Sequence, residues 1–370
     1  LIDDYDKPVW DYSENQQELK ANKRILQEFF ATVKAYHEQL HFVLFTGQAM
    51  FNSCSICKGL DQITDLTMKR EAATLAGITH EELKSVFAAH LESFTGWNDS
   101  AKTLLSLIRD EYLGYSFDGT TLVYNPFTMI SLFYHGEIAD YWYQMTPPNK
   151  VMRKIRIRNY PFLELENQSL SLDLFSKHSV EQLPLLLLLL QQGYLTINRY
   201  NPAQKHLTLN YPNRSVARAF TRDLLLNLSS LKADQADALI NLIIQSLQNK
   251  ETDEFMRFLQ KLCRSIDYPI MDLNAHYCHS VFYLIMRVLT FYVEGNIQVK
   301  EHFVLVKLFI QKREFILEFA TRNHPSAFVH LLDEGFHEHK SKRMRERVLI
   351  GINFSVDKRH IKDYEIQTIR

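Results

Sequence analysis

Residues 303–319 read FVLVKLFIQKREFILEF, and this stretch decides the fold of the C-terminal part of the chain. Phe303–Phe309 and Phe315–Phe319 are apolar runs of strand length, separated by a polar turn around Lys312 and Arg313. Such continuous apolar runs are typical of strands buried on both faces of a sheet. The patterns on either side are a helix (276–289) and a strand (291–298) before them, and a helix (326–337) and a strand (348–354) after them. The sequence therefore predicts an α-β-β-β-α-β unit.

The composition is that of a folded protein. Of the 370 residues, 46% are hydrophobic and 23% are charged, which excludes intrinsic disorder. At roughly 100 to 200 residues per domain, this length predicts two or three domains. With 11 Gly and 10 Pro, the chain favours many helices over a β-sandwich. The net charge of -1 gives no general attraction to DNA or to an anionic membrane, so any basic surface must be local.

Cysteine content and hydropathy restrict the compartment. Four cysteines are too few for a disulfide framework in a chain of this length, so we expect a protein of the reducing cytoplasm. The longest apolar run, Leu185–Leu190, is far shorter than the ~20 residues of a membrane span, so we expect no membrane segment. The chain opens at Leu1 inside an apolar strand pattern, and we therefore expect that part of a longer protein precedes it.

The N-terminal region combines short strands with helices. Leu1 and Ile2 read as the end of a buried strand, an amphipathic helix is predicted within residues 15–39, and the apolar run 41–47 predicts a second buried strand. Helices dominate from there to about residue 146. One of them should start near His80, because Thr79 and Glu82 have the spacing of a capping box, and should continue to about residue 94.

The middle of the chain predicts a small module followed by a further helix. Residues 179–212 read as a helix, Gly193, a strand (194–200) and a second strand (206–209). An amphipathic helix follows around residues 239–247.

Two adjacent carboxylates, Asp3 and Asp4, follow the first strand. An apolar strand that ends in two acids is the Walker B arrangement, in which the first acid holds Mg²⁺ and the second orients or deprotonates the attacking water. Asp3 and Asp4 would take those roles; the alternative is an ordinary solvated strand end. The 370 residues contain no G-x-x-x-x-G-K-[ST] sequence, so the backbone cradle for phosphates is missing from them. Acids without a cradle would not hold a nucleotide.

Several short motifs stand in a characteristic order along the chain. They are LIDDYDKP at 1–8, FTG at 45–47, the stretch 60–79 that ends in AGIT, GYSF at 114–117, and YNPF at 124–127. Together they resemble the AAA-ATPase-like family of microbial proteins, and QGYLT at 192–196 and YPN at 211–213 are similar to its linking region. The C-terminal unit resembles the PD-(D/E)XK nuclease-like domain usually fused to that family. The resemblance covers essentially the whole chain.

The resemblance implies a mixed α/β, helix-rich protein in three parts. Residues 1–148 would be the remainder of a P-loop-NTPase-type α/β domain, from Walker B onward, with its helical lid. Residues 149–250 would be a linking helical and hairpin module. Residues 251–370 would be a restriction-endonuclease-like domain with degenerate motifs.

The same resemblance assigns residues to a nucleotide site. Thr46 would be the polar sensor residue that contacts the γ-phosphate, and Asp3 the magnesium ligand, provided that a P-loop is supplied upstream of Leu1. The second acid is usually Glu in this family, so Asp4 is one methylene shorter and would reach the water less well. The family pattern Tyr-Asp-Gly-Tyr stands here as Tyr-Leu-Gly-Tyr at 112–115, which lacks the acid.

The nuclease-like part departs further from its family. Such domains hold Mg²⁺ with a helix Glu, a strand Asp and a Glu-x-Lys on the next strand. Aligned by strand order, these positions fall at Asn274, at Leu305, and at Glu318 with Ala320. Only Glu318 survives as a candidate catalytic residue, and its alternative is a structural role. One carboxylate does not build a magnesium site, so we expect no nuclease activity.

Two basic segments are candidate contacts for nucleic acid. They are Lys150–Arg158 and Lys340–Arg347, with solvated loops as the alternative. The sequence therefore favours a non-catalytic role, as an interaction or nucleic-acid-associated remnant without a cofactor of its own and away from membranes. The alternative is the C-terminal part of an ATP-hydrolysing protein that uses Mg²⁺ and ATP in its full-length form.

Overall fold

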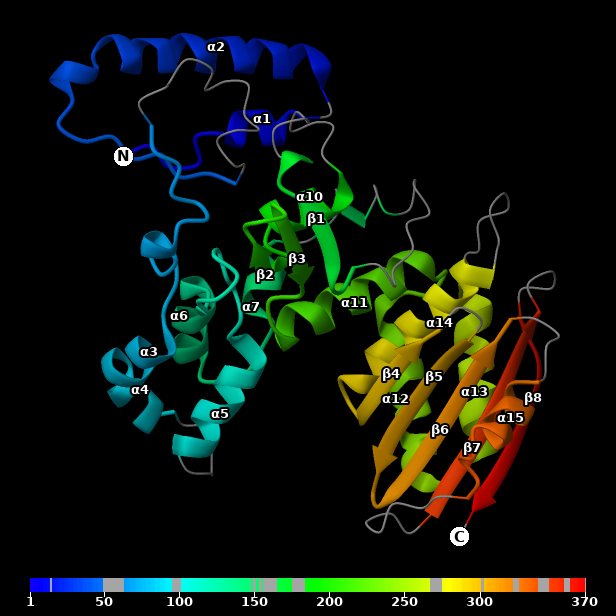
Figure 1. The fold of residues 1–370 in the computed structure, drawn as a ribbon. Helices are drawn as coiled ribbons and strands as arrows, with labels where there is room; N and C mark the ends of the chain where they lie inside the picture. The colour runs from blue at the N-terminus through cyan, green and yellow to red at the C-terminus, as the bar shows by residue number, and fades with distance from the viewer. Residues whose placement is uncertain are drawn as a thin grey trace. The chain divides into compact units, whose positions relative to one another are not determined.

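The computed structural model describes residues 1–13, 15–48, 63–94, 101–146, 148, 151–152, 155, 165–174, 184–266, 275–300, 303–321, 326–338, 346–355 and 360–369. These residues form a mixed α/β protein with two sheets (Figure 1). The chain divides into two compact units. The N-terminal unit comprises Leu1–Val151 and Leu165–Ala217, and the sheet unit comprises Met152–Glu164 and Arg218–Arg370. Within the described ranges, no helix has the length and hydropathy of a membrane span.

The N-terminal unit begins with helices α1 (Lys7–Asp11) and α2 (Gln16–Ala35). Asn15 caps α2, because its side chain accepts hydrogen bonds from the backbone N–H groups of Gln17 and Glu18. The predicted helix within 15–39 is therefore confirmed. The predicted strand at 41–47 is reduced to one parallel bridge between Ile2 and Phe45. Phe45 packs edge-on against Phe30 of α2, with ring centroids 5.2 Å apart, which holds this segment against the helix.

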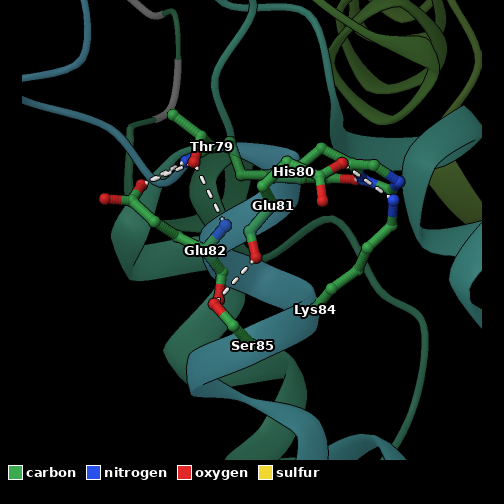
Figure 2. A network of polar contacts seen from close by, with 7 residues as sticks. Thr79, His80, Glu81, Glu82, Lys84 and Ser85 are labelled. Carbon is green, nitrogen blue, oxygen red and sulfur yellow. Dashed lines mark hydrogen bonds and ion pairs between the residues drawn. The ribbon is translucent and has the colours of Figure 1, made fainter.

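A helical part follows in the N-terminal unit. Its elements are short 3-10 turns at His37–Gln39 and Arg70–Ala72 and the helices α3 (His80–Val86), α4 (Ala88–Glu92), α5 (Ala101–Tyr112), α6 (Pro126–His135) and α7 (Tyr141–Met145). The predicted capping box is confirmed: Thr79 N donates to Glu82 Oε2 at 2.8 Å, and Glu82 N donates to Thr79 Oγ1 at 3.2 Å (Figure 2). The predicted helix 80–94 is divided at Phe87. These helices share a core that includes Leu83, Leu104, Ile108, Tyr124, Met129 and Leu132.

Residues 184–210 of the N-terminal unit contain the predicted helix and hairpin, which are α10 (Leu185–Gln191), β2 (Thr196–Asn201) and β3 (His206–Asn210). A further strand that the sequence did not predict, β1 (Gln168–Ser171), pairs with β3, so the small sheet has the order β1-β3-β2. Helix α11 (Arg214–Leu228) follows. Gly114 adopts φ 145°, and a Cβ there would lie 1.8 Å from the carbonyl oxygen of Pro212, so only glycine fits this approach of two backbones.

The sheet unit contains the predicted α-β-β-β-α-β order. Its elements are α12 (Ala233–Asn249), α13 (Thr252–Ser265), α14 (Ala275–Thr290), β4 (Glu294–Val299), β5 (Phe303–Ile310), β6 (Arg313–Ala320), α15 (Ala327–Asp333), β7 (Glu346–Ser355) and β8 (His360–Ile369). The five strands lie in the order β4-β5-β6-β7-β8, as Figure 1 shows. Strand β7 runs parallel to β6, and the other neighbours are antiparallel. The sequence did not predict β8.

Helices cover both faces of this sheet, which explains its continuous apolar strands. On one face, Phe282 of α14 stacks on Phe319 of β6, with ring centroids 4.1 Å apart. On the other face, Leu331 of α15 forms a core with residues of three strands, Leu305, Ile316 and Leu349. Gly351 permits this approach, because a Cβ there would lie 2.3 Å from the backbone nitrogen of Phe328 in α15.

Charged residues occupy the start of β6, where the sequence predicted a turn. The turn itself lies at Gln311 and Lys312, which have φ values of 47° and 66°, as two-residue hairpin loops require. Arg313 and Glu314 therefore belong to β6, and they stand opposite Glu346 and Arg347 on β7. Opposite charges thus face each other at both positions.

Candidate functional site

The candidate magnesium residue Asp3 lies at the end of the first strand. Ile2 pairs in parallel with Phe45, Ile2 N donates to Leu44 O at 2.8 Å, and Thr46 N donates to Ile2 O at 2.9 Å. Asp3 and Thr46 are therefore the next residues on two neighbouring parallel segments. The Thr46 hydroxyl donates a hydrogen bond to Asp3 Oδ1, and the Asp4 N–H donates to the same oxygen at 3.1 Å. The structure brings these two predicted residues together at one solvent-exposed edge.

Asp4, the other predicted acid, points to a different neighbour. Its backbone has φ 52°, a left-handed conformation that non-glycine residues adopt rarely. Its carboxylate lies 3.9 Å from Lys7 Nζ, and half of its side chain is exposed. The Asp4 carboxylate is therefore directed to Lys7, whereas the Asp3 carboxylate contacts Thr46.

A third acid, Asp6, holds this edge together, and the sequence analysis missed it. Asp6 is fully buried and accepts hydrogen bonds from Trp10 Nε1 at 2.7 Å and from Gln48 N at 3.1 Å. It thus ties α1 to the segment that follows Thr46. A Cβ on Gly47 would lie 2.5 Å from Asp6 Oδ1, so a larger residue at that position would displace the Asp6 carboxylate. The sequence signal for this contact was the combination of Asp6, the tryptophan four residues later and Gly47.

Glu318, the acid that the sequence analysis selected as a candidate catalytic residue, is buried in the sheet unit. It lies on β6, opposite Leu305 of β5 and Gly351 of β7. Two of the aligned positions, Leu305 and Glu318, are thus strand neighbours. Glu318 is 1% exposed. Ala320 ends β6, and Asn274 lies outside the described residues.

The partner of Glu318 is His330 of α15. His330 Nδ1 lies 2.9 Å from Glu318 Oε2, and its Nε2 lies 3.8 Å from Glu334 Oε1. The His330 ring also packs on Phe303, with ring centroids 4.5 Å apart. Burial raises the pKa of Glu318, and the hydrogen bond to His330 opposes this rise only in part. The carboxylate therefore faces a histidine and apolar side chains.

His279 of α14 has a different environment. It is 1% exposed, and its Nε2 lies 3.2 Å from the hydroxyl of Thr321. Across the described ranges, no three His, Cys, Asp or Glu side chains are grouped as a metal site would require.

The two basic segments lie mostly outside the described residues. In the first, Val151, Met152 and Ile155 are described, and all three are buried. In the second, Arg347 is described, and the structure corrects its assignment to a nucleic-acid surface. It is 7% exposed, its Nη2 lies 2.7 Å from Glu314 Oε2, and its Nη1 donates to Phe336 O. A buried, paired guanidinium does not reach a phosphate backbone.

Comparisons with known proteins bear on the segment that holds Asp3 and Thr46. Residues 1–57 match the model of the AAA-ATPase-like family, described as "Predicted AAA-ATPase". An uncharacterised protein encoded in the 5′ region of vnfD in Azotobacter chroococcum mcd 1 is 25% identical over 385 residues. The similarity spans 100% of this chain and 71% of that protein. No solved structure matches.

Proposed function

We propose that residues 1–48 carry the magnesium side of an ATP site and that a segment outside residues 1–370 contributes the phosphate-binding loop. The observation that carries this proposal is the hydrogen bond from Thr46 to Asp3, at the common end of two parallel segments. Open α/β folds bind their ligands at the carboxyl ends of parallel strands. The match of residues 1–57 to an AAA-ATPase-like family supports the same assignment.

Each residue has a stated role in this proposal. Asp3 supplies carboxylate oxygens, the ligands that Mg²⁺ prefers, and the bound metal would neutralise charge on the phosphates. Thr46 donates its single hydroxyl proton to Asp3 and so positions that carboxylate; to contact the terminal phosphate, this hydroxyl must turn away from Asp3. Asp4 orients the attacking water, for which its contact with Lys7 must open. Asp6 keeps the edge in place through Trp10 and Gln48.

The test is ATP hydrolysis by the protein expressed from the complete reading frame that encodes these residues. Asp3→Asn should lower the rate by about a hundredfold or more, as the loss of a charge-stabilising group in an active site does. Thr46→Ser should retain activity that Thr46→Ala loses. Asp11→Asn changes an exposed acid at the end of α1 and serves as the matched control. Full activity of Asp3→Asn, or no ATP hydrolysis by the wild type, would refute the proposal.

For the sheet unit we infer a non-catalytic role. Glu318 is buried against His330, and Leu305 stands opposite it. The resemblance to nuclease-like domains aligns Ala320, the last residue of β6, with the lysine of their motif. This set offers one carboxylate where hydrolysis with Mg²⁺ needs several oxygen ligands. The test is incubation of the full chain with Mg²⁺ and single-stranded or double-stranded DNA. Cleavage that Glu318→Ala abolishes would overturn this inference.

A further inference from the structure

Strand β4 forms one edge of the five-stranded sheet (Figure 1). It pairs with β5 on its inner side, and the described part of the chain places no strand on its outer side. Glu294, Asn296, Gln298 and Lys300 are all exposed, and Val299 is 41% exposed. An edge strand presents a row of backbone N–H and C=O groups that can pair with another strand.

The direction of these backbone groups follows from one hydrogen bond. Lys300 N donates to Phe303 O at 2.9 Å, so the N–H of Lys300 points inward, toward β5. The β4–β5 pairing runs without a register shift from Glu294 to Val299. Because inward and outward groups alternate along an antiparallel strand, Gly295, Ile297 and Val299 point their N–H and C=O groups outward.

The sequence of β4 complements itself when an antiparallel copy is centred on Ile297. Ile297 then meets Ile297 of the second copy, and Asn296 meets Gln298. Glu294 meets Lys300, and the two-fold symmetry repeats this opposite-charge pair. The outward residues exchange hydrogen bonds, while the charged and amide pairs occupy the positions between them, where side chains on facing strands come closest.

The apolar side of the strand fits the same register. Val299 falls opposite Gly295. The structure leaves no room for a side chain at position 295, because a Cβ there would lie 2.7 Å from Leu308 Cδ2 and 2.8 Å from Lys307 O. The partly exposed Val299 side chain therefore meets no competing side chain across the interface.

At the opposite edge of the sheet, no two-fold centred on a residue of β8 places Lys362 opposite an acid of that strand. In β8, a two-fold centred on Tyr364 places Asp363 opposite Glu365, and a two-fold centred on either acid places two identical carboxylates opposite each other. Like charges directly opposite each other destabilise strand pairs. We propose that β4 pairs antiparallel with β4 of a second copy of this chain, and that the two sheets join through this pair into one continuous mixed sheet across a two-fold axis.

The experiment is sedimentation velocity of the full chain over a range of protein concentrations. The wild type should form a dimer. Glu294→Lys and Lys300→Glu each turn both charge pairs repulsive and should raise the dimer dissociation constant about fivefold or more. An equimolar mixture of these two single variants should form heterodimers as tightly as the wild type, because both charge pairs are then attractive. The double variant E294K/K300E should also dimerise.

Two further variants keep the result unambiguous. Val299→Pro removes an outward N–H without removing a bond to β5, so it should abolish the dimer while the circular dichroism spectrum stays unchanged. Glu365→Lys, an equal charge change on β8, should leave the dimer intact. A wild type that is monomeric at all concentrations overturns the proposal. A dimer that is indifferent to these β4 variants, or a mixture that fails to restore association, overturns it as well.

Discussion

Replacement of Arg347 should destabilise the sheet unit strongly, because the Glu314 carboxylate would then be buried without its ion-pair partner. Arg347 is 7% exposed and Glu314 is 6% exposed. The guanidinium contacts Glu314 Oε2 through Nε at 2.8 Å and Nη2 at 2.7 Å, and it also donates to Phe336 O. Breaking a buried ion pair by removing one partner costs ~3 to 5 kcal/mol, because the other charge stays buried without compensation. We therefore expect Arg347→Leu to lower the free energy of unfolding by about that amount.

The double variant E314L/R347L should be much less destabilised than the sum of the two single variants. With both charges removed, the remaining cost is the carbonyl of Phe336, which loses its donor at about 1 to 3 kcal/mol. Arg257→Ala is the matched control, because its ion pair with Glu254 on α13 is largely exposed. Exposed pairs contribute ~1 kcal/mol or less.

Hydrogen exchange of backbone amides in β6 and β7, read by mass spectrometry, is the suitable assay. The three tryptophans, at positions 10, 97 and 142, all precede the sheet unit, so their fluorescence would not report its unfolding. Exchange through opening of the unit measures its free energy directly. Two results would refute the reasoning: single-variant costs that simply add, or an Arg347→Leu cost no larger than that of Arg257→Ala.

Three other perturbations test separate contacts. Burial raises the pKa of Glu318 in the folded state, so its contribution to stability is complete below the unfolded pKa and is lost as pH rises through the folded value. Relative to Glu318→Gln, the wild type should therefore lose stability as pH rises from about 4 toward neutrality. Hydrogen exchange in β6 measures this difference. Stability curves of the two proteins that run parallel over this pH range would contradict the expectation. Thr79→Ala removes the capping box of α3 and should speed amide exchange in that helix by the equivalent of ~1 kcal/mol. Ser85→Ala, in the same network (Figure 2), should change the exchange little. Equal effects of the two variants would show that the capping box does not stabilise α3. Gly351→Ala should displace α15 and expose α15 amides to exchange, because its Cβ would meet the backbone of Phe328; unchanged protection would show that α15 shifts without cost.

Local patterns predicted several elements correctly. The apolar runs of β5 and β6, the capping box at Thr79, the helix at 16–35 and the hairpin of β2 and β3 all depend on residues near each other in the sequence. Strand β8 escaped prediction because only Ile361 of its ten residues is buried at this sheet edge, so the strand has neither a continuous apolar run nor a regular alternation. The strand predicted at 41–47 is reduced to one bridge, because Phe45 pairs with Ile2 and packs on α2 whereas Phe42 is 73% exposed.

By itself, the amino-acid sequence determined which functional groups each position offers, because these groups are set by residue identity alone. The 370 residues contain no G-x-x-x-x-G-K-[ST] sequence, and positions 305 and 320 carry the apolar residues Leu305 and Ala320. Only the tertiary structure decided the neighbours of those residues. Thr46 reaches Asp3, His330 reaches Glu318, and Arg347 is enclosed with Glu314, because strand pairing and a crossover helix bring together residues that are distant in sequence. The periodicity of apolar residues indicates which positions are buried. Contacts between charged residues depend instead on the register in which neighbouring strands pair.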